Sequence, residues 1–238
     1  MNAVLKPTRY LSRQQLIQQR ARYLQLELWN RRAELWTHEV PQSPLDVLQP
    51  GVGLKLAGFE IESRDFLGDE WDRGVHTEVA GLLDRDLGKV FISTRQSRVV
   101  QNFTAAHELG HALLHPHVDV KHRELPMDGP RGRSSWEERE ADWFATEFLM
   151  PEKQVRKEFA NRFGEAIFHL TDATAYALCG CSLEKVLLRC RSPRDLSKIL
   201  AETPTYNGRT FPSMAGRFSV SSKAMAIRID ELRLSAFM

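Results

Sequence analysis

The sequence predicts an α+β protein, with a small sheet in the middle of the chain and mostly helical segments at both ends. Three observations favour this class. Residues 103–116 are rich in helix formers and end at a proline. Residues 79–93 alternate as two short strands around a turn that contains Gly88. Residues 12–36 carry apolar side chains at helical spacing, and residues 152–202 contain the glycine, serine and proline signals of helix ends.

An N-terminal helical segment is expected over residues 1–45. Residues 12–36 are predicted to form one long helix. The apolar positions that share a stripe are Leu16, Tyr23, Leu24 and Leu28. The arginines around this stripe are Arg20, Arg22, Arg31 and Arg32. Their face is either a solvated surface or a contact for a partner or nucleic acid, and the prolines that follow mark a linker.

The sheet is expected inside a domain that spans residues 46–203. Val52, Leu54 and Leu56 alternate, so residues 51–62 are predicted to include a strand. A hairpin is predicted from residues 79–83 to residues 90–93. Asp84 and Arg85 fall in its turn and are expected to be solvated.

A motif of the form H-E-x-x-H lies in residues 103–116. His107 and His111 are four residues apart, so on a helix they occupy one face and can bind one Zn²⁺. Glu108 is placed to act as a base on the attacking water rather than as a ligand. The alternative is a buried helix whose two histidines are satisfied by hydrogen bonds.

A second helix, in residues 134–151, is expected to supply the third ligand. Ser134 and Glu137 form a possible capping box, and a proline ends the segment. The positions predicted to be buried are Ala141, Phe144, Ala145, Phe148 and Leu149. Glu138 lies at the edge of this face as a ligand candidate, and Asp142 could accept the N–H of a ligating histidine. Glu137 and Glu140 are expected to be solvated, and acidic residues in a first turn also favour the helix dipole.

Two blocks, F-T-A-A-H-E-L-G-H-A-L-L-H and E-R-E-A-D-W-F-A-T-E-F-L-M-P, resemble the ImmA/IrrE family of zinc metallopeptidases. The resemblance covers residues 81–152 and implies a zincin-like domain in which a sheet lies on the H-E-x-x-H helix. It implies zinc as cofactor, His107, His111 and Glu138 as ligands, and Glu108 as base. One departure is Asp142, which stands where the family usually has Asn.

The segment between the two helices, residues 116–133, is predicted to be a loop that borders the cleft. His117 and His122 are candidates to stabilise an oxyanion. His115 shares a face with the two ligand candidates, but a role at the helix C-terminus is favoured over ligation.

The remainder is predicted to be helical over residues 152–163, 165–179, 183–191 and 194–202. Cys179, Cys181 and Cys190 could place a thiolate on the zinc and hold the enzyme latent, but buried thiols are favoured. Residues 204–238 are expected to form a small helix-turn-helix-like segment. In this tail Arg217, Lys223 and Arg228 could touch phosphate, although packing on the core is favoured.

The composition limits the partners and the cellular compartment that we expect. The net charge of +2 demands no nucleic-acid partner, and three cysteines do not suggest a disulfide framework. Without an apolar run of spanning length or a signal peptide, we expect a cytoplasmic protein with no membrane contact.

The resemblance implies a zinc-dependent endopeptidase that cleaves a helix-turn-helix repressor and derepresses a stress, phage or defence operon. Candidate activators are single-stranded DNA or another nucleic acid, and cysteine oxidation. The alternative is a non-catalytic, zinc-stabilised regulator that binds nucleic acid or a partner protein. The two hypotheses differ on Glu108, which only catalysis requires.

Overall fold

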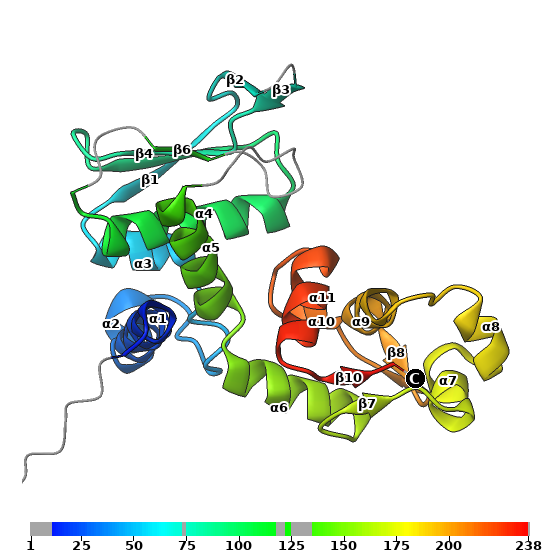
Figure 1. Cartoon of the computed structure of the whole chain (residues 1–238). Helices are drawn as coiled ribbons and strands as arrows, with labels where there is room; N and C mark the ends of the chain where they lie inside the picture. Colours follow the sequence, from blue (N-terminus) through cyan, green and yellow to red (C-terminus); the bar gives the residue numbers. More distant parts are fainter. Residues whose placement is uncertain (1–10, 73–74, 118–121, 125–134, 238) are drawn as a thin grey trace, which may run out of the picture.

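A computed structural model describes residues 11–72, 75–117, 122–124 and 135–237 (Figure 1). Their helices and small sheets form the α+β architecture that the sequence predicts. A four-stranded sheet and the helices beneath it make up one part of the molecule, and a group of mostly short helices makes up the other.

The N-terminal segment forms α1 (Arg13–Asn30) and α2 (Arg32–Leu35), so the single helix predicted for residues 12–36 is interrupted at Arg31. Ser12 begins α1 through a capping box with Gln15. The buried face, which packs against α5 (Trp136–Leu149), consists of Ile17, Ala21, Leu24 and Leu28. The predicted stripe was therefore wrong for Leu16 and Tyr23, which are 43% and 64% exposed.

The strand predicted within residues 51–62 is present only at residues 60–62, which begin β1 (Glu60–Arg64). Residues 51–56 belong instead to helix α3 (Pro50–Leu56). Pro50 stands in its first turn, where the missing N–H costs no hydrogen bond. Gly53 lets α3 approach α4 (Arg98–Leu114), since a Cβ at that position would lie 2.7 Å from Leu109 Cδ2. Packing against a neighbouring helix has overridden the alternating pattern.

The main sheet has the order β1 (Glu60–Arg64), β5 (Lys89–Ser93), β4 (Gly81–Asp84) and β6 (His122–Glu124). The predicted hairpin is confirmed, because β4 and β5 pair antiparallel around Gly88, whose φ is 62°. β1 joins β5 in parallel. β6 pairs with β4 inside the segment predicted as loop, which corrects that prediction for three residues. β2 (Asp69–Asp72) and β3 (Val75–Glu78) form a separate ribbon.

Helix α4 lies at the centre of this part of the molecule. It packs against β4 and β5 on one side, and against α3 and α5 elsewhere (Figure 1). α4 and α5 approach closely at Gly110, where a Cβ would lie 3.0 Å from Ala141 Cα. The sheet-on-helix arrangement implied by the resemblance is therefore present.

After α5 the chain forms α6 (Glu152–Phe163), β7 (Phe168–His169), α7 (Asp172–Cys179), α8 (Leu183–Leu187) and α9 (Pro193–Glu202). It then forms β8 (Thr205–Tyr206), β9 (Arg209–Thr210), α10 (Met214–Arg217), α11 (Ser222–Glu231) and β10 (Ser235–Ala236). Two predicted helices were too long, because residues 168–169 are a strand and α8 ends four residues early. The two short helices of the tail are confirmed.

The domain boundaries stay a prediction. Across the expected division at residue 203, α9 packs against α11 and β7 pairs with β10. No helix in the described ranges has both the length and the apolar composition of a membrane span.

Candidate metal centre

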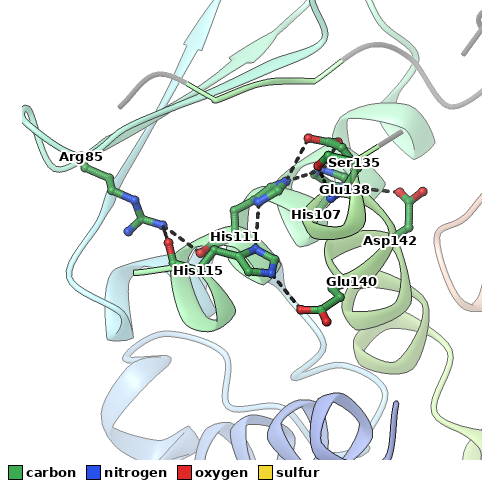
Figure 2. Close-up of polar contacts among 8 residues, drawn as sticks. All are labelled: Arg85, His107, His111, His115, Ser135, Glu138, Glu140 and Asp142. Carbon is green, nitrogen blue, oxygen red and sulfur yellow. Dashed lines mark hydrogen bonds and ion pairs between the residues drawn. The ribbon is translucent and has the colours of Figure 1, made fainter. Parts of the chain in front are cut away.

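Three donor groups converge where α4 meets α5 (Figure 2). His107 Nε2 lies 2.9 Å from His111 Nε2 and 3.3 Å from Glu138 Oε2. His111 Nε2 lies 3.6 Å from Glu138 Oε1. One donor atom from each residue falls within 4.8 Å of the others. The structure thus brings together the three ligand candidates proposed from the sequence.

Local structure explains this convergence. His107 and His111 lie one turn apart on the buried stretch of α4, so both imidazoles leave the helix on one face. Ser135 begins α5 by accepting the Glu138 N–H at 3.3 Å, which places Glu138 in the first turn. The cap is therefore one residue later than predicted, and Ser134 lies outside the described residues.

A carboxylate orients the first histidine. Asp142 Oδ1 lies 3.0 Å from His107 Nδ1, as expected from its place one turn beyond Glu138. An ionised carboxylate only accepts hydrogen bonds, so His107 Nδ1–H donates. Nε2 of the same ring then keeps its lone pair for the point of convergence.

Another histidine orients the second ligand candidate. His111 Nδ1 lies 3.1 Å from His115 Nδ1, and His115 Nε2 lies 3.0 Å from Glu140 Oε2. His115 is the C-cap residue of α4 and is buried. Its position at the helix C-terminus agrees with the sequence, but its contact with His111 was not anticipated. The four-residue spacing of His107, His111 and His115 was the available signal.

Glu140 is fully buried rather than solvated, which corrects the sequence prediction. Its carboxylate accepts two hydrogen bonds from Arg13, at 2.6 Å from Nε and 2.7 Å from Nη2. These bonds are the main reason that the pKa of Glu140 lies below its ordinary value. Buried carboxylates are rare without such a partner.

The hairpin turn supports the C-terminal end of α4. Arg85 Nη2 donates to the backbone oxygens of His111 and His115, at 2.8 and 3.0 Å (Figure 2). Burial lowers the pKa of Arg85. Asp84 is buried and accepts the N–H of Leu87 at 3.1 Å. The expectation that Asp84 and Arg85 are solvated was therefore wrong.

Glu108 is fully buried beneath the sheet. Strand β4 passes close to it, because a Cβ at Gly81 would lie 3.0 Å from Glu108 Oε1 and 2.4 Å from Thr104 Cγ2. A glycine at this position therefore makes room for the carboxylate of the candidate base.

Among the described residues, the group of side chains that could hold a metal contains no cysteine. Figure 1 places α7 and α8 at the end of the molecule remote from α4. Cys179 is exposed and Cys190 is buried, and burial raises the pKa of the Cys190 thiol to about 11. Only Cys179 lies on one of these helices, since Cys181 and Cys190 fall outside both, and latency through a thiolate stays a prediction.

Most of the segment over residues 116–133 lies outside the described residues, as does the His122 side chain, so the predictions of a cleft border and an oxyanion role there stay predictions. His117 is exposed.

In the tail, Arg228 is buried and donates to Met150 O at 3.0 Å and to Glu147 at 2.9 Å. Arg228 therefore packs on the core, as the favoured reading of the tail expects.

The donor set fits zinc. Two imidazole nitrogens and one carboxylate oxygen are the ligands of a known class of catalytic zinc sites that keeps one position open. The two rings that would ligate are buried, and each has a partner on its other nitrogen, as metal-binding histidines usually do.

Comparison with known families supports the interpretation of these residues as part of a metallopeptidase. Residues 73–167 match the model of a peptidase family described as the IrrE N-terminal-like domain. The match contains both ligand-bearing helices and the hairpin above them. A comparison with curated proteins gave no match. The matched segment and the metal-site geometry it contains identify residues 73–167 as a domain of the ImmA/IrrE metallopeptidase family.

Proposed function

We propose that this chain is a zinc-dependent endopeptidase that cleaves a partner helix-turn-helix repressor and so derepresses a stress, phage or defence operon. One observation carries the catalytic part: His107, His111 and Glu138 converge within 4.8 Å, and Glu108, which follows His107 on α4, is buried. The choice of repressor as substrate rests on the family resemblance.

Zinc binding and proton transfer are assigned to different residues. His107, His111 and Glu138 would hold zinc, which when bound supplies a Lewis acid that polarises the scissile carbonyl and lowers the pKa of water toward about 7. Glu108 accepts a proton from the attacking water and passes it to the leaving amine. Its burial beneath β4 limits exchange of that proton with bulk solvent.

The sheet offers a binding mode for the substrate. β4 passes over Glu108, and β6 is the edge strand on that side of the described sheet. An extended peptide could pair with such an edge through backbone hydrogen bonds. A folded repressor would have to unfold locally to present such a segment.

Glu108→Gln tests catalysis directly. The substitution keeps the size of the side chain and removes the base, so we expect zinc content to stay at the wild-type level and cleavage to be lost. The measurement is co-expression with a helix-turn-helix repressor, sought first among the genes beside this one, followed by mass spectrometry of the repressor fragments. Equal cleavage by the two proteins would show that Glu108 is not the base.

The experiment also separates peptidase from binding module. If the repressor stays intact but is released from its operator equally by wild type and Glu108→Gln, the non-catalytic alternative is favoured. If the repressor stays intact and bound, single-stranded DNA added to the purified pair tests the proposed nucleic-acid activator.

A further inference from the structure

The N-terminal helix reaches the metal centre through a chain of polar side chains. Arg13 in the first turn of α1 binds Glu140 on α5 through two hydrogen bonds. Glu140 contacts His115, and His115 contacts His111, with nitrogen-to-acceptor distances of 3.0 and 3.1 Å. Arg13 and Glu140 are 127 residues apart in sequence, so tertiary packing alone brings them together.

Each hydrogen bond in this chain fixes the direction of the next. An ionised Glu140 only accepts, so His115 Nε2–H donates to it. In the neutral ring, His115 Nδ1 is then the acceptor, and His111 Nδ1–H must donate to it. His111 Nε2 is left with its lone pair directed to the point where zinc would bind. The ionised Glu140, which Arg13 binds, thus selects the tautomer of His111 that ligation requires.

The place of Arg13 in the helix favours this interpretation. A cation in the first turn of a helix is unfavourable for the helix dipole, and α1 has no acidic residue in that turn. Arg13 therefore contributes little to the stability of α1 itself. Its partner is fully buried, and a buried carboxylate needs a cation far more than an exposed one does.

Contacts farther along α1 hold Arg13 in register. Gln25 Nε2 donates to the backbone oxygens of Glu147 and Phe148, at 2.8 and 3.0 Å. These bonds join α1 to the far end of α5, while Arg13 joins it to the first two turns. The geometry at Glu140 is therefore set by the docking of the whole helix.

We propose that Arg13 is a positioning residue of the zinc site, which acts through Glu140 and His115 to hold His111 in its ligating tautomer and orientation. The proposal rests on the proposed zinc-binding function. It makes the N-terminal helix, which precedes the matched family segment, part of the metal centre.

Zinc affinity tests the proposal without reference to cleavage. The variants are Arg13→Ala, Arg13→Lys, which keeps the charge but loses the two-point geometry, and Arg20→Ala as a matched control on the exposed side of α1. We expect Arg13→Ala to raise the zinc dissociation constant about tenfold, the lower end of the loss when an outer partner of a ligand is removed. Arg13→Lys should fall between wild type and Arg13→Ala, and Arg20→Ala should match wild type. Competition with a chromophoric chelator gives each constant.

A second background distinguishes positioning from stability. With Glu140→Gln already present, Arg13→Ala should cause little further loss of affinity, because the chain is broken at Glu140. An unchanged zinc constant in Arg13→Ala, even with a lower melting temperature of the metal-free protein, would overturn the proposal. A wild-type protein that binds no zinc would instead overturn the proposed function.

Discussion

At the scale of single residues, His115 has more influence on the metal centre than its place outside the ligand set suggests. Its ring lies between His111, whose Nδ1 is 3.1 Å away, and the buried Glu140, whose Oε2 is 3.0 Å away. His115→Ala should therefore weaken zinc binding by about 10- to 100-fold, because such partners fix the ring of a ligand. The measurement is zinc retained against a chelator.

His117→Ala is the matched control for this prediction, since His117 is exposed and lies just beyond the end of α4. It should retain zinc as the wild type does. Equal retention by the two variants would mean that His115 contributes only packing.

Sequence spacing identified some of these residues and not others. The roles of Glu138 and Asp142 could be predicted, because the two residues are one helical turn apart and lie beside a face defined by apolar neighbours. Glu140 could not, because its partners Arg13 and His115 lie 127 and 25 residues away. The same applies to Arg85, whose bonds to α4 depend on how the hairpin packs on that helix. Local patterns carry no information on such pairs.

At the scale of elements, the close packing of α4 on α5 sets the metal geometry, because the two helices carry different ligands. A methyl group at Gly110 would meet Ala141 Cα at 3.0 Å and Ala141 O at 3.2 Å, which are backbone atoms that cannot rotate away. Gly110→Ala should therefore push the helices apart and destabilise the protein by about 1–3 kcal/mol. Zinc affinity should fall too, as Glu138 withdraws from the histidines.

Gly51→Ala provides the control for this helix-packing effect. A Cβ at Gly51 would make only ordinary contact, 3.7 Å from Ile61 Cγ2, and alanine is the better helix former in α3. Urea denaturation and chelator competition measure both effects. Gly110→Ala with unchanged stability and zinc affinity would show that the helices can adjust without cost.

Elements with strong local signals were predicted well. The β4–β5 hairpin has alternation together with a glycine at positive φ, and α6 ends at Gly164 in the left-handed conformation. α3 was missed because a short stretch of alternating apolar residues also suits a helix buried on more than one side. The packing of α3 against α4, which brings Gly53 close to Leu109, is tertiary and leaves no local signal in the sequence.

At the scale of the whole molecule, α5 joins the parts of the chain. α1 docks along it, α4 shares the metal centre with it, and α11 is anchored to its C-terminal end. The anchor to α11 is the part of this arrangement that a single substitution can remove.

Arg228 forms that anchor. Its side chain is buried, and it donates to Met150 O and to Glu147 from Nε and Nη2, while Nη1 lies 3.2 Å from Glu231. Arg228→Ala leaves the largely buried Glu147 carboxylate and a backbone oxygen without this donor. Because removal of one partner from a buried ion pair is costly, we expect a loss of about 3 kcal/mol in the free energy of unfolding.

Urea denaturation measures this loss, and Lys185→Ala, at an exposed position of α8, is the control. Limited proteolysis should also cut Arg228→Ala faster near residues 150–152, where α5 passes into α6.

The same variant decides whether Arg228 in the tail contacts phosphate or packs on the core. If Arg228 served chiefly to bind phosphate, its removal would weaken nucleic-acid binding and leave stability at the level of Lys185→Ala. Because its guanidinium is buried against α5, we expect the loss to appear in stability.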